Sequence, residues 1–418
     1  MMWPPGTPPP LSASVPRSRV GADGGPGHEL RGQVGEADAR HMDRARELAG
    51  RGWGTVHPNP MVGCVLVKDG VVVGEGWHAR FGGPHAEVQA LQVAGEAARG
   101  STAYVSLEPC NHQGKTPPCT GALLEAGVRR VVFGAADPGR RSGGGGESLA
   151  RGGIQVTGPV LSPEEARRDN PAFFHPDPTR PWTVLKLATG LDGSLTRAPG
   201  ERTRLTGPEA NEKVHRLRAG MDAILVGGRT ARFDNPLLTV RGEVAARVPP
   251  ARVVLDPGPG FEEDARLFGE DAPLWIVVAE EDEAATRRAR RWAAAGARIL
   301  EIPRVRVAGR QEDAGTAAQP PEPPRVDPEA LLRRLREEGV AALLCEGGAQ
   351  LAHSLVEGAL VDRLVLITTP HTLGEESVRL PRLPHGRWRA VDRPARLGED
   401  IWTTWDRQGP LRRTSGQD

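Results

Sequence analysis

Cysteine and long apolar runs are both scarce in this chain, and each shortage excludes a class of protein. Only 4 of the 418 residues are cysteine, which is too few for a disulfide scaffold. No apolar run reaches about 18 residues, the length that a membrane-spanning helix needs. The N-terminus also lacks the apolar segment of a secretory signal. We therefore expect a protein of the reducing cytoplasm that does not bind membranes.

An excess of one charge is missing as well. Lysine plus arginine total 54 and aspartate plus glutamate total 53, so no overall field recruits nucleic acid or an anionic membrane. Aromatic residues make up only 4% of the chain, which also argues against a nucleic-acid-binding module. Lysine itself is rare, and its positions are Lys68, Lys115, Lys186 and Lys213.

Composition and periodicity divide the chain into two folded halves with less regular segments around them. Pro, Gly, Ser and Arg dominate the first residues without any periodicity, which predicts a disordered extension. A Pro-rich stretch near the middle predicts a linker. The expected order is an extension over 1–35, a first domain over 36–170, a linker over 171–181, a second domain over 182–408 with a disordered insertion at 304–327, and a tail over 409–418.

Strand and helix patterns alternate in both halves, which predicts an α/β sheet in each. In the first half, MVGCVLVKDGVVVGEGW places two β-branched runs around Asp69-Gly70, a strong hairpin signal. AEVQALQVAGEAA has apolar residues at helical spacing. In the second half, PEALLRRLREEG predicts a helix that Asp327 caps. Candidates for buried strands there are WTVLKLAT, DAILVGG, RVVLD, PLWIVVA and VAALLCEGG.

One histidine, one glutamate and two cysteines form the clearest candidate site. PHAEVQA supplies His85 and Glu87, and LEPCNHQGKTPPC supplies Cys110 and Cys119. A catalytic zinc takes three protein ligands and leaves one position for water, so His85, Cys110 and Cys119 predict a zinc centre. Glu87, in the first turn of the predicted helix, can then transfer protons while hydroxide attacks a ring carbon that bears an amino group.

Two other interpretations of these residues stay open. A structural zinc site usually has four ligands and CxxC spacing, whereas eight residues separate these cysteines and Glu87 would have no role. The residues could also be unligated core residues, but both cysteines follow a proline, Pro109 or Pro118, outside any continuous apolar run. Cys64 and Cys345 do lie in apolar runs, and we expect them to be core thiols.

Six segments resemble, in the same order, the bifunctional deaminase–reductases of riboflavin biosynthesis. They are HPNPMVGCVLVKDG, PHAEVQAL, LEPCNHQGKTPPC, LKLATGLDG, ILVGGRTARFDNPLLTVR and EGGAQL. The resemblance runs from about Asp38 to Trp405. It implies a cytidine-deaminase-like three-layer α/β domain followed by a dihydrofolate-reductase-like α/β domain.

This resemblance also implies two consecutive reactions and their cofactors. The first is zinc-dependent hydrolytic deamination of 2,5-diamino-6-(5-phosphoribosylamino)pyrimidin-4-one. The second is NADPH-dependent reduction of the ribosyl group to ribityl, giving 5-amino-6-(5-phosphoribitylamino)uracil. We expect one Zn²⁺ per deaminase domain, NADPH in the second domain, and a homo-oligomer whose partner is the small pyrimidine substrate.

Individual site residues follow from the same resemblance. Catalysis maps onto Glu87 and Lys186. The implied substrate-binding residues are Asn59, His78, Lys115, Arg202, Arg218, Leu238, Arg241 and Glu346. The implied cofactor-binding residues are Ala188, Arg204, Thr230, Asp234, Gly347, Gly348 and Ala349.

Physical chemistry supports several of these positions, although each residue alone also suits a structural role. A guanidinium binds phosphate through two hydrogen bonds, which suits Arg218 and Arg241, yet this chain is rich in arginine. Gly347 and Gly348 precede a predicted helix whose N-terminus can bind a pyrophosphate, and a plain strand-to-helix turn also favours glycine. A strand-edge salt bridge is the structural alternative for Lys186.

Two stretches depart from the family pattern. GRRSGGGG follows Asp137-Pro138, where the family usually continues with Asn-Pro. It has neither the ending nor the context of a phosphate-binding loop, so we expect a flexible loop. Arg202 and Arg204 stand where many relatives have Ser and Trp, and their charge suits the 2′-phosphate of NADPH.

Two further interpretations of the whole chain stay open. One keeps the zinc deaminase and makes the second half inactive, although Lys186, Asp234 and Glu346 at predicted strand ends argue against it. The other is a zinc-stabilised module that binds nucleic acid, against which the charge balance and the few aromatic residues argue.

Overall fold

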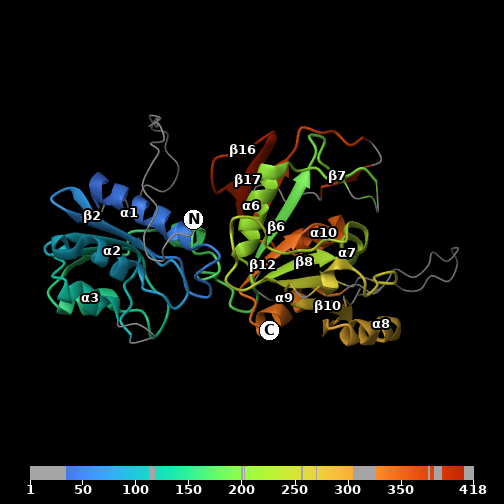
Figure 1. Ribbon diagram of the computed structural model, residues 1–418, viewed down its shortest axis with the longest axis horizontal. Coiled ribbons are helices and arrows are strands. Elements are labelled where there is room, and N and C mark those ends of the chain that lie inside the picture. Colours follow the sequence, from blue (N-terminus) through green and yellow to red (C-terminus); the bar gives the residue numbers. More distant parts are fainter. Residues whose placement is uncertain are drawn as a thin grey trace, which may run out of the picture.

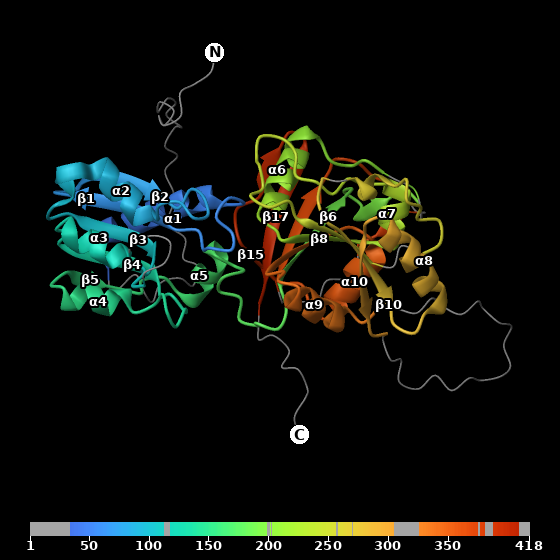
Figure 2. The same ribbon diagram turned by 60° about the horizontal axis from the view of Figure 1, so that its bottom comes forward.

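Two α/β domains lie side by side along the long axis of the computed structural model (Figures 1 and 2). The structure describes residues 34–112, 118–198, 201, 203–255, 258–269, 271–304, 326–374, 377–380 and 388–408. The predictions for Lys115, Arg202, residues 1–33, residues 305–325 and the tail 409–418 therefore lie outside the described residues. Within the described part of the chain, no helix combines the length and the apolar character that crossing a membrane requires.

The first domain is built on a five-stranded sheet in the order β2-β1-β3-β4-β5. Its strands are β1 (Gly63–Lys68), β2 (Val71–Trp77), β3 (Thr102–Leu107), β4 (Arg130–Ala135) and β5 (Gln155–Thr157). The predicted hairpin is confirmed, because β1 and β2 pair antiparallel and Asp69 and Gly70 both take the positive φ that such a turn needs. From β3 onward the strands run parallel.

Helices cover both faces of this sheet and make a three-layer domain. They are α1 (Glu36–Ala49), α2 (Ala86–Ala94), α3 (Cys119–Glu125), α4 (Gly145–Arg151) and α5 (Pro163–Asp169), with short 3₁₀ turns η1 (Gly50–Gly52) and η2 (Gly95–Ala98). Side chains alternate along β1: Cys64 and Leu66 pack with α2, α3 and α4, whereas Val65 and Val67 pack with α1. The domain thus has one apolar layer on each side of its sheet.

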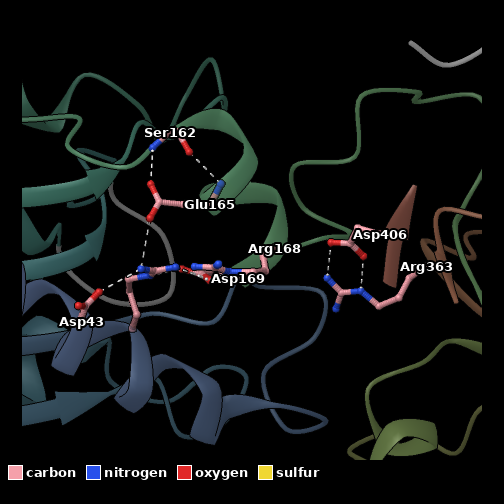
Figure 3. Close-up of polar contacts among 8 residues, drawn as sticks. Asp43, Ser162, Glu165, Arg168, Asp169, Arg363 and Asp406 are labelled. Carbon is pink, nitrogen blue, oxygen red and sulfur yellow. Dashed lines mark hydrogen bonds and ion pairs between the residues drawn. The ribbon is translucent and has the colours of Figure 1, made fainter. Parts of the chain in front are cut away.

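The helix α5 closes the first domain by linking back to α1. Ser162 and Glu165 form a capping box at the start of α5. Arg46 of α1 bonds to Asp169, at the end of α5, and also pairs with Glu165 and Asp43. Figure 3 shows Asp43, Glu165 and Asp169 gathered between the two helices. This charge network fixes the position at which the chain leaves the first domain.

The second domain has a ten-stranded sheet with the path β11-β10-β9-β8-β12-β6-β13-β17-β15, and β16 pairs with β17. The strands of this sheet are β6 (Trp182–Thr189), β8 (Ala223–Gly227), β9 (Ala251–Leu255), β10 (Leu274–Ala279), β11 (Arg298–Ile302), β12 (Ala342–Glu346), β13 (Arg363–Thr368), β15 (Trp388–Ala390), β16 (Ala395–Leu397) and β17 (Asp400–Arg407). A separate short pair joins β7 (Ser194–Thr196) to β14 (Val378–Arg379). From β11 through β13 all neighbours are parallel.

Both faces of the parallel part are covered, as buried parallel sheets require. The covering elements are α6 (Pro208–Ala219), α7 (Gly228–Asp234), η3 (Arg266–Phe268), α8 (Glu283–Ala294), α9 (Pro328–Glu337) and α10 (Ala349–Glu357). The core on one face includes residues of α6, α7 and α8, and the core on the other includes residues of α9 and α10. Asp327 accepts hydrogen bonds from the first backbone N–H groups of α9, which confirms the predicted cap.

Ion pairs anchor the segment between α5 and β6. Arg180 forms two hydrogen bonds to Asp362, and the Thr183 N–H donates to the same carboxylate at 2.8 Å. His175 Nε2 lies 3.2 Å from it. Burial disfavours the charged form of Asp362, but hydrogen bonds from Arg180 and His175 outweigh burial and hold its pKa at about 2. The chain therefore enters the second domain at a fixed point.

Candidate active sites

Three ligand-type side chains converge at the helix ends of the first domain. His85 is the N-cap of α2, Cys119 is the first residue of α3, and Cys110 follows β3. His85 Nδ1 lies 3.2 Å from Cys119 Sγ and 3.5 Å from Cys110 Sγ. All three ligand atoms lie within 4.8 Å of one another. A tetrahedral zinc with bonds of about 2.1–2.3 Å leaves its ligands about 3.5–3.8 Å apart, so the three side chains fit this ion.

The charge state of the two thiols also suits a cation. The hydrogen bond with Cys119 lowers the pKa of Cys110 to about 4, and His85 acts in the same direction. The same bond raises the pKa of Cys119, and the bond to Cys110 raises the pKa of His85. The contacts with Cys119 and His85 therefore favour the thiolate form of Cys110, which is the form that binds metal.

Glu87 lies beside these ligands in the first turn of α2. Its side chain is 3% exposed and interacts with the Cys119 thiol. Burial raises the pKa of the Glu87 carboxyl. A buried carboxyl with a raised pKa is suited to accept a proton and return it near neutral pH. Its position two residues after a ligand is the arrangement that the sequence predicts.

Asn59 and His78 form a second layer behind His85. His78 is 3% exposed, and its ring centroid lies 5.4 Å from that of His85. His78 Nδ1 lies 3.1 Å from the Pro84 carbonyl. Because a carbonyl only accepts, Nδ1 carries the proton, and Nε2 accepts from the Asn59 amide at 3.2 Å. His78 is therefore a buried residue with both ring nitrogens in contact with polar partners.

The Gly-rich stretch is more ordered than the sequence suggested, because its end begins α4. A Cβ at Gly145 would lie 1.7 Å from the Pro109 carbonyl oxygen, so only glycine permits this approach beside Cys110. Glu108 accepts hydrogen bonds from the Gly146 and Asp137 N–H groups. The sequence did not predict a role for Glu108 or Gly145. The run of four glycines that contains Gly145 could have indicated a close approach of two backbone segments.

In the second domain, three predicted residues meet beside two neighbouring strands. Glu346 ends β12, but the prediction that Lys186 ends a strand is wrong, because β6 continues to Thr189. Lys186 of β6 pairs in register with Glu346 of β12, and its Nζ lies 3.9 Å from the carboxylate. Arg218, near the end of α6, donates two hydrogen bonds to Glu346 and a third to the Thr239 carbonyl. All three charged side chains are at most 16% exposed, so they form one buried ionic cluster.

The pKa values of Glu346 and Lys186 in this cluster are both lowered, for different reasons. Burial opposes ionisation of Glu346, but Arg218 outweighs burial and holds the pKa of its carboxyl at about 2. Burial lowers the pKa of the Lys186 ammonium, and Glu346 partly offsets this. Two cations therefore share one anion, which leaves positive charge for an incoming phosphate or oxygen.

Several predicted cofactor residues also come together at this end of the sheet. Gly347 and Gly348 have φ values of 84° and 85°, and a Cβ on Gly348 would lie 3.4 Å from Thr230 Oγ1. Ala349 begins α10 directly afterwards. The prediction that Asp234 ends a strand is wrong, because Thr230 and Asp234 both lie in α7, a helix that the sequence did not predict.

The remaining predicted residues have no contact with this ionic cluster among those described above. Leu238 is 3% exposed and belongs to the apolar core, and Ala188 lies two residues after Lys186 on β6. Arg241 is exposed, and its N–H donates to His215 Nδ1 at 3.3 Å. Arg204 is exposed in the segment between β7 and α6.

Sequence reasoning missed His215 altogether. It lies three positions before Arg218 on α6, hence on the same helical face. This spacing was the available signal. Burial lowers the pKa of its imidazole, and the Arg218 charge acts in the same direction.

Comparison with known proteins agrees with this pair of sites, a zinc-binding deaminase domain joined to a reductase domain. The model of the cytidine and deoxycytidylate deaminase zinc-binding region matches residues 35–135. The model of the RibD C-terminal domain matches residues 181–387. The chain is 37% identical to the riboflavin biosynthesis protein RibD of Escherichia coli, over 85% of this chain and 94% of that protein. The RibD of Aquifex aeolicus is 36% identical, over 82% and 89% of the two chains.

Solved structures give the same result. RibD of Acinetobacter baumannii superposes with a TM-score of 0.71 at 31% identity, covering 91% of this chain and all of the other. A diaminohydroxyphosphoribosylaminopyrimidine deaminase/5-amino-6-(5-phosphoribosylamino)uracil reductase of Thermotoga maritima gives 0.71 at 30% identity, covering 89% and 99%. The chain belongs to the RibD family of riboflavin biosynthesis proteins and is a bifunctional enzyme, a deaminase and a reductase.

Proposed function

We propose that the chain deaminates 2,5-diamino-6-(5-phosphoribosylamino)pyrimidin-4-one and then reduces the ribosyl group to ribityl with NADPH. The product is 5-amino-6-(5-phosphoribitylamino)uracil. The observation that carries this proposal is the His85, Cys110 and Cys119 trio with Glu87 beside it, in a chain whose second domain buries Lys186 with Glu346. We assign the two activities to residues 36–170 and 182–408.

In the first reaction, water replaces the amino group of the pyrimidine and ammonia leaves. His85, Cys110 and Cys119 would hold a zinc ion, which acidifies a water molecule when it is bound. Glu87 accepts a proton from water and passes it to the departing amino group. Asn59 hydrogen-bonds the flat pyrimidine ring while His78 fixes the orientation of its amide. Lys115 binds the substrate's phosphate as a point charge.

In the second reaction, a hydride adds to C1′ of the ribosyl group, the bond from C1′ to the ring oxygen breaks, and that oxygen takes up a proton. NADPH supplies the hydride when it is bound. Lys186 orients this oxygen and delivers the proton, and its lowered pKa makes the transfer easier. Arg202, Arg218, Leu238, Arg241 and Glu346 contact the substrate. Ala188, Thr230, Asp234, Gly347, Gly348 and Ala349 contact the cofactor, and the exposed Arg204 suits its 2′-phosphate.

Following ammonia and NADPH separately tests this proposal. We expect the purified protein to release ammonia from the diaminopyrimidine without NADPH, and to oxidise NADPH only after deamination. Ammonia release without loss of NADPH absorbance would favour a deaminase with an inactive second domain. The ratio of kcat/KM with NADPH to that with NADH tests the coenzyme preference.

Two further expectations belong with this proposal. The chain forms a homo-oligomer, which light scattering tests as a molar mass that is a multiple of that of a single chain. A cytoplasmic location remains a prediction that rests on the use of cysteine, and imaging of the tagged protein tests it.

A further inference from the structure

The segment between η1 and the turn at Asn59 belongs to the first domain but bonds to the second. Trp53 Nε1 donates to the Arg216 carbonyl of α6 at 2.8 Å, and the indole packs against the core of the second domain. A Cβ at Gly220 would lie 2.1 Å from Trp53 Cε2, so the glycine that ends α6 makes room for the ring. This contact is close-packed as well as polar.

His57 provides a second attachment a few residues further along the segment. Its Nε2 lies 2.6 Å from Asp222 Oδ1. The other oxygen of Asp222 accepts from the N–H groups of Ala341 and Ala342 at the start of β12, both at 2.8 Å. Asp222 is thereby fixed to the central strands of the second domain, and His57 is attached to a rigid point.

Arg247 closes the attachment from the side of the second domain. Its backbone N–H donates to the Gly54 carbonyl at 2.9 Å, and its Nε donates to the His57 carbonyl at 2.7 Å. Its guanidinium carbon lies 4.7 Å from the centroid of the Phe81 ring. The Phe81 N–H in turn donates to the Thr55 carbonyl at 3.0 Å. All the residues that Arg247 contacts here belong to the first domain.

The same segment runs directly into the deaminase site. The Asn59 N–H donates to the Val56 carbonyl at 2.9 Å, so Asn59 closes the turn that contains His57. The Asn59 amide donates to His78, which lies against His85. A displacement of His57 would therefore move the backbone from which the Asn59 amide projects.

We infer that the second domain orients the deaminase substrate through this segment, with Trp53, His57 and Arg247 as positioning residues. The inference rests on the proposed role of Asn59 in binding the pyrimidine. If this were only a contact between domains, its loss would change the stability of the fold and not the binding of substrate. Here three side chains attach the short segment that ends at Asn59, so their loss changes substrate binding while the metal ligands and Glu87 stay in place.

Arg247→Ala in the full-length, zinc-loaded protein tests this inference, because Arg247 is exposed and lies in the other domain. We expect the KM for deamination to rise about 5-fold, as the loss of one hydrogen bond implies, with kcat and zinc content unchanged. The kinetics of reduction should also stay the same. Arg287→Ala is the control, since Arg287 pairs with Glu283 on exposed α8, and it should change nothing.

Two further variants separate positioning from folding. Arg247→Lys keeps a cation near Phe81 and should restore most of the wild-type KM. Trp53→Phe keeps an aromatic ring but removes the indole N–H, and should raise KM in the same direction as Arg247→Ala. A fall in kcat with an unchanged KM in both Arg247→Ala and Trp53→Phe would overturn the inference.

Hydrogen exchange gives a readout that does not depend on turnover. We expect the amides of residues 55–62 and 78–85 to exchange faster in Arg247→Ala than in wild type and Arg287→Ala. Unchanged exchange there would refute the inference whatever the kinetics show. A different outcome would refute the proposed function instead. The amides would exchange faster in Arg247→Ala, which supports the positioning role, but the wild-type protein itself would release no ammonia from the diaminopyrimidine.

Discussion

The two candidate sites balance their charges in different ways. In the first domain, Cys110 and Cys119 face His85 with Glu87 beside them, so the donors converge on a point that a cation completes. In the second domain, Lys186 and Arg218 already share the Glu346 carboxylate. The first site therefore depends on an ion from outside, whereas the second is held together by its own side chains. Substitutions should separate the two.

The largest expected effect comes from removing a metal ligand. Cys119→Ser replaces a sulfur donor with a hydroxyl, which is a poor zinc donor, so we expect loss of most of the zinc and of nearly all deamination. Reduction of the deaminated substrate should continue, since Lys186 and Glu346 are untouched. Metal analysis and the two separate assays measure this, with Cys64→Ala as the control for a buried cysteine outside the trio. Full zinc content in Cys119→Ser would contradict the ligand assignment.

Glu87→Gln should separate proton transfer from metal binding. The amide keeps the size of the side chain but cannot carry a proton, so deamination should fall about 1000-fold while zinc stays bound. Ammonia release and zinc content, measured on the same sample, check this. Turnover at the wild-type rate would remove Glu87 from the mechanism.

Lys186→Ala applies the same logic to the second site. Reduction should fall about 100-fold, because one preorganised charge beside the reacting oxygen is lost, and deamination should be unchanged. Lys213→Ala is a matched control, since Lys213 lies over the Trp402 ring at 4.7 Å. If Lys186→Ala lost both activities together, the domains would act as one cooperative unit.

The smallest expected effect on activity comes from Asp362→Asn, which tests stability. Arg180 would lose its charged partner, so we expect the free energy of unfolding to fall by about 3 kcal/mol. Both activities should remain intact at 25 °C. Urea unfolding followed by circular dichroism measures this, with the exposed Asp392→Asn as the control. A loss no greater than that of the control would mean that the pair contributes little.

The pH dependence of stability sharpens the same test. The pKa of Asp362 in the folded protein is about 2, below the value of about 3.9 in an unfolded chain. Its carboxylate therefore stabilises the fold above about pH 4, and this contribution is lost as the pH falls toward 2. The difference in stability between wild type and Asp362→Asn should shrink over this range.

Local patterns made parts of this fold and of the first site predictable. The Asp69-Gly70 turn and the Asp327 cap depend on short sequence spacings, and the structure contains both. His85, Cys110 and Cys119 also come together, as their residue types predicted. Burial of Cys64 and Cys345 followed from their apolar neighbours. Such features need only a few adjacent residues to be recognised.

The remaining features depend on contacts between distant segments. Arg218 and Glu346 are 128 positions apart, and no spacing rule joins them. The short strands from β14 to β16 gave no usable signal, because each has three residues or fewer. The attachment of His57 to Asp222 required knowledge of how the domains meet. Resemblance to a family suggested Arg218 and Glu346 as site residues, but not that they bond to each other.

The order of the strands determines when each site can be completed during synthesis. The first sheet ends at Thr157, so His85, Cys110 and Cys119 are all synthesised before the second domain begins. β12 instead inserts between β6 and β8, both made much earlier. Until residue 346 emerges, Lys186 and Arg218 lack their shared anion and a gap divides the sheet. Nascent chains that stop before β12 should therefore carry a complete first domain beside an unfinished second one.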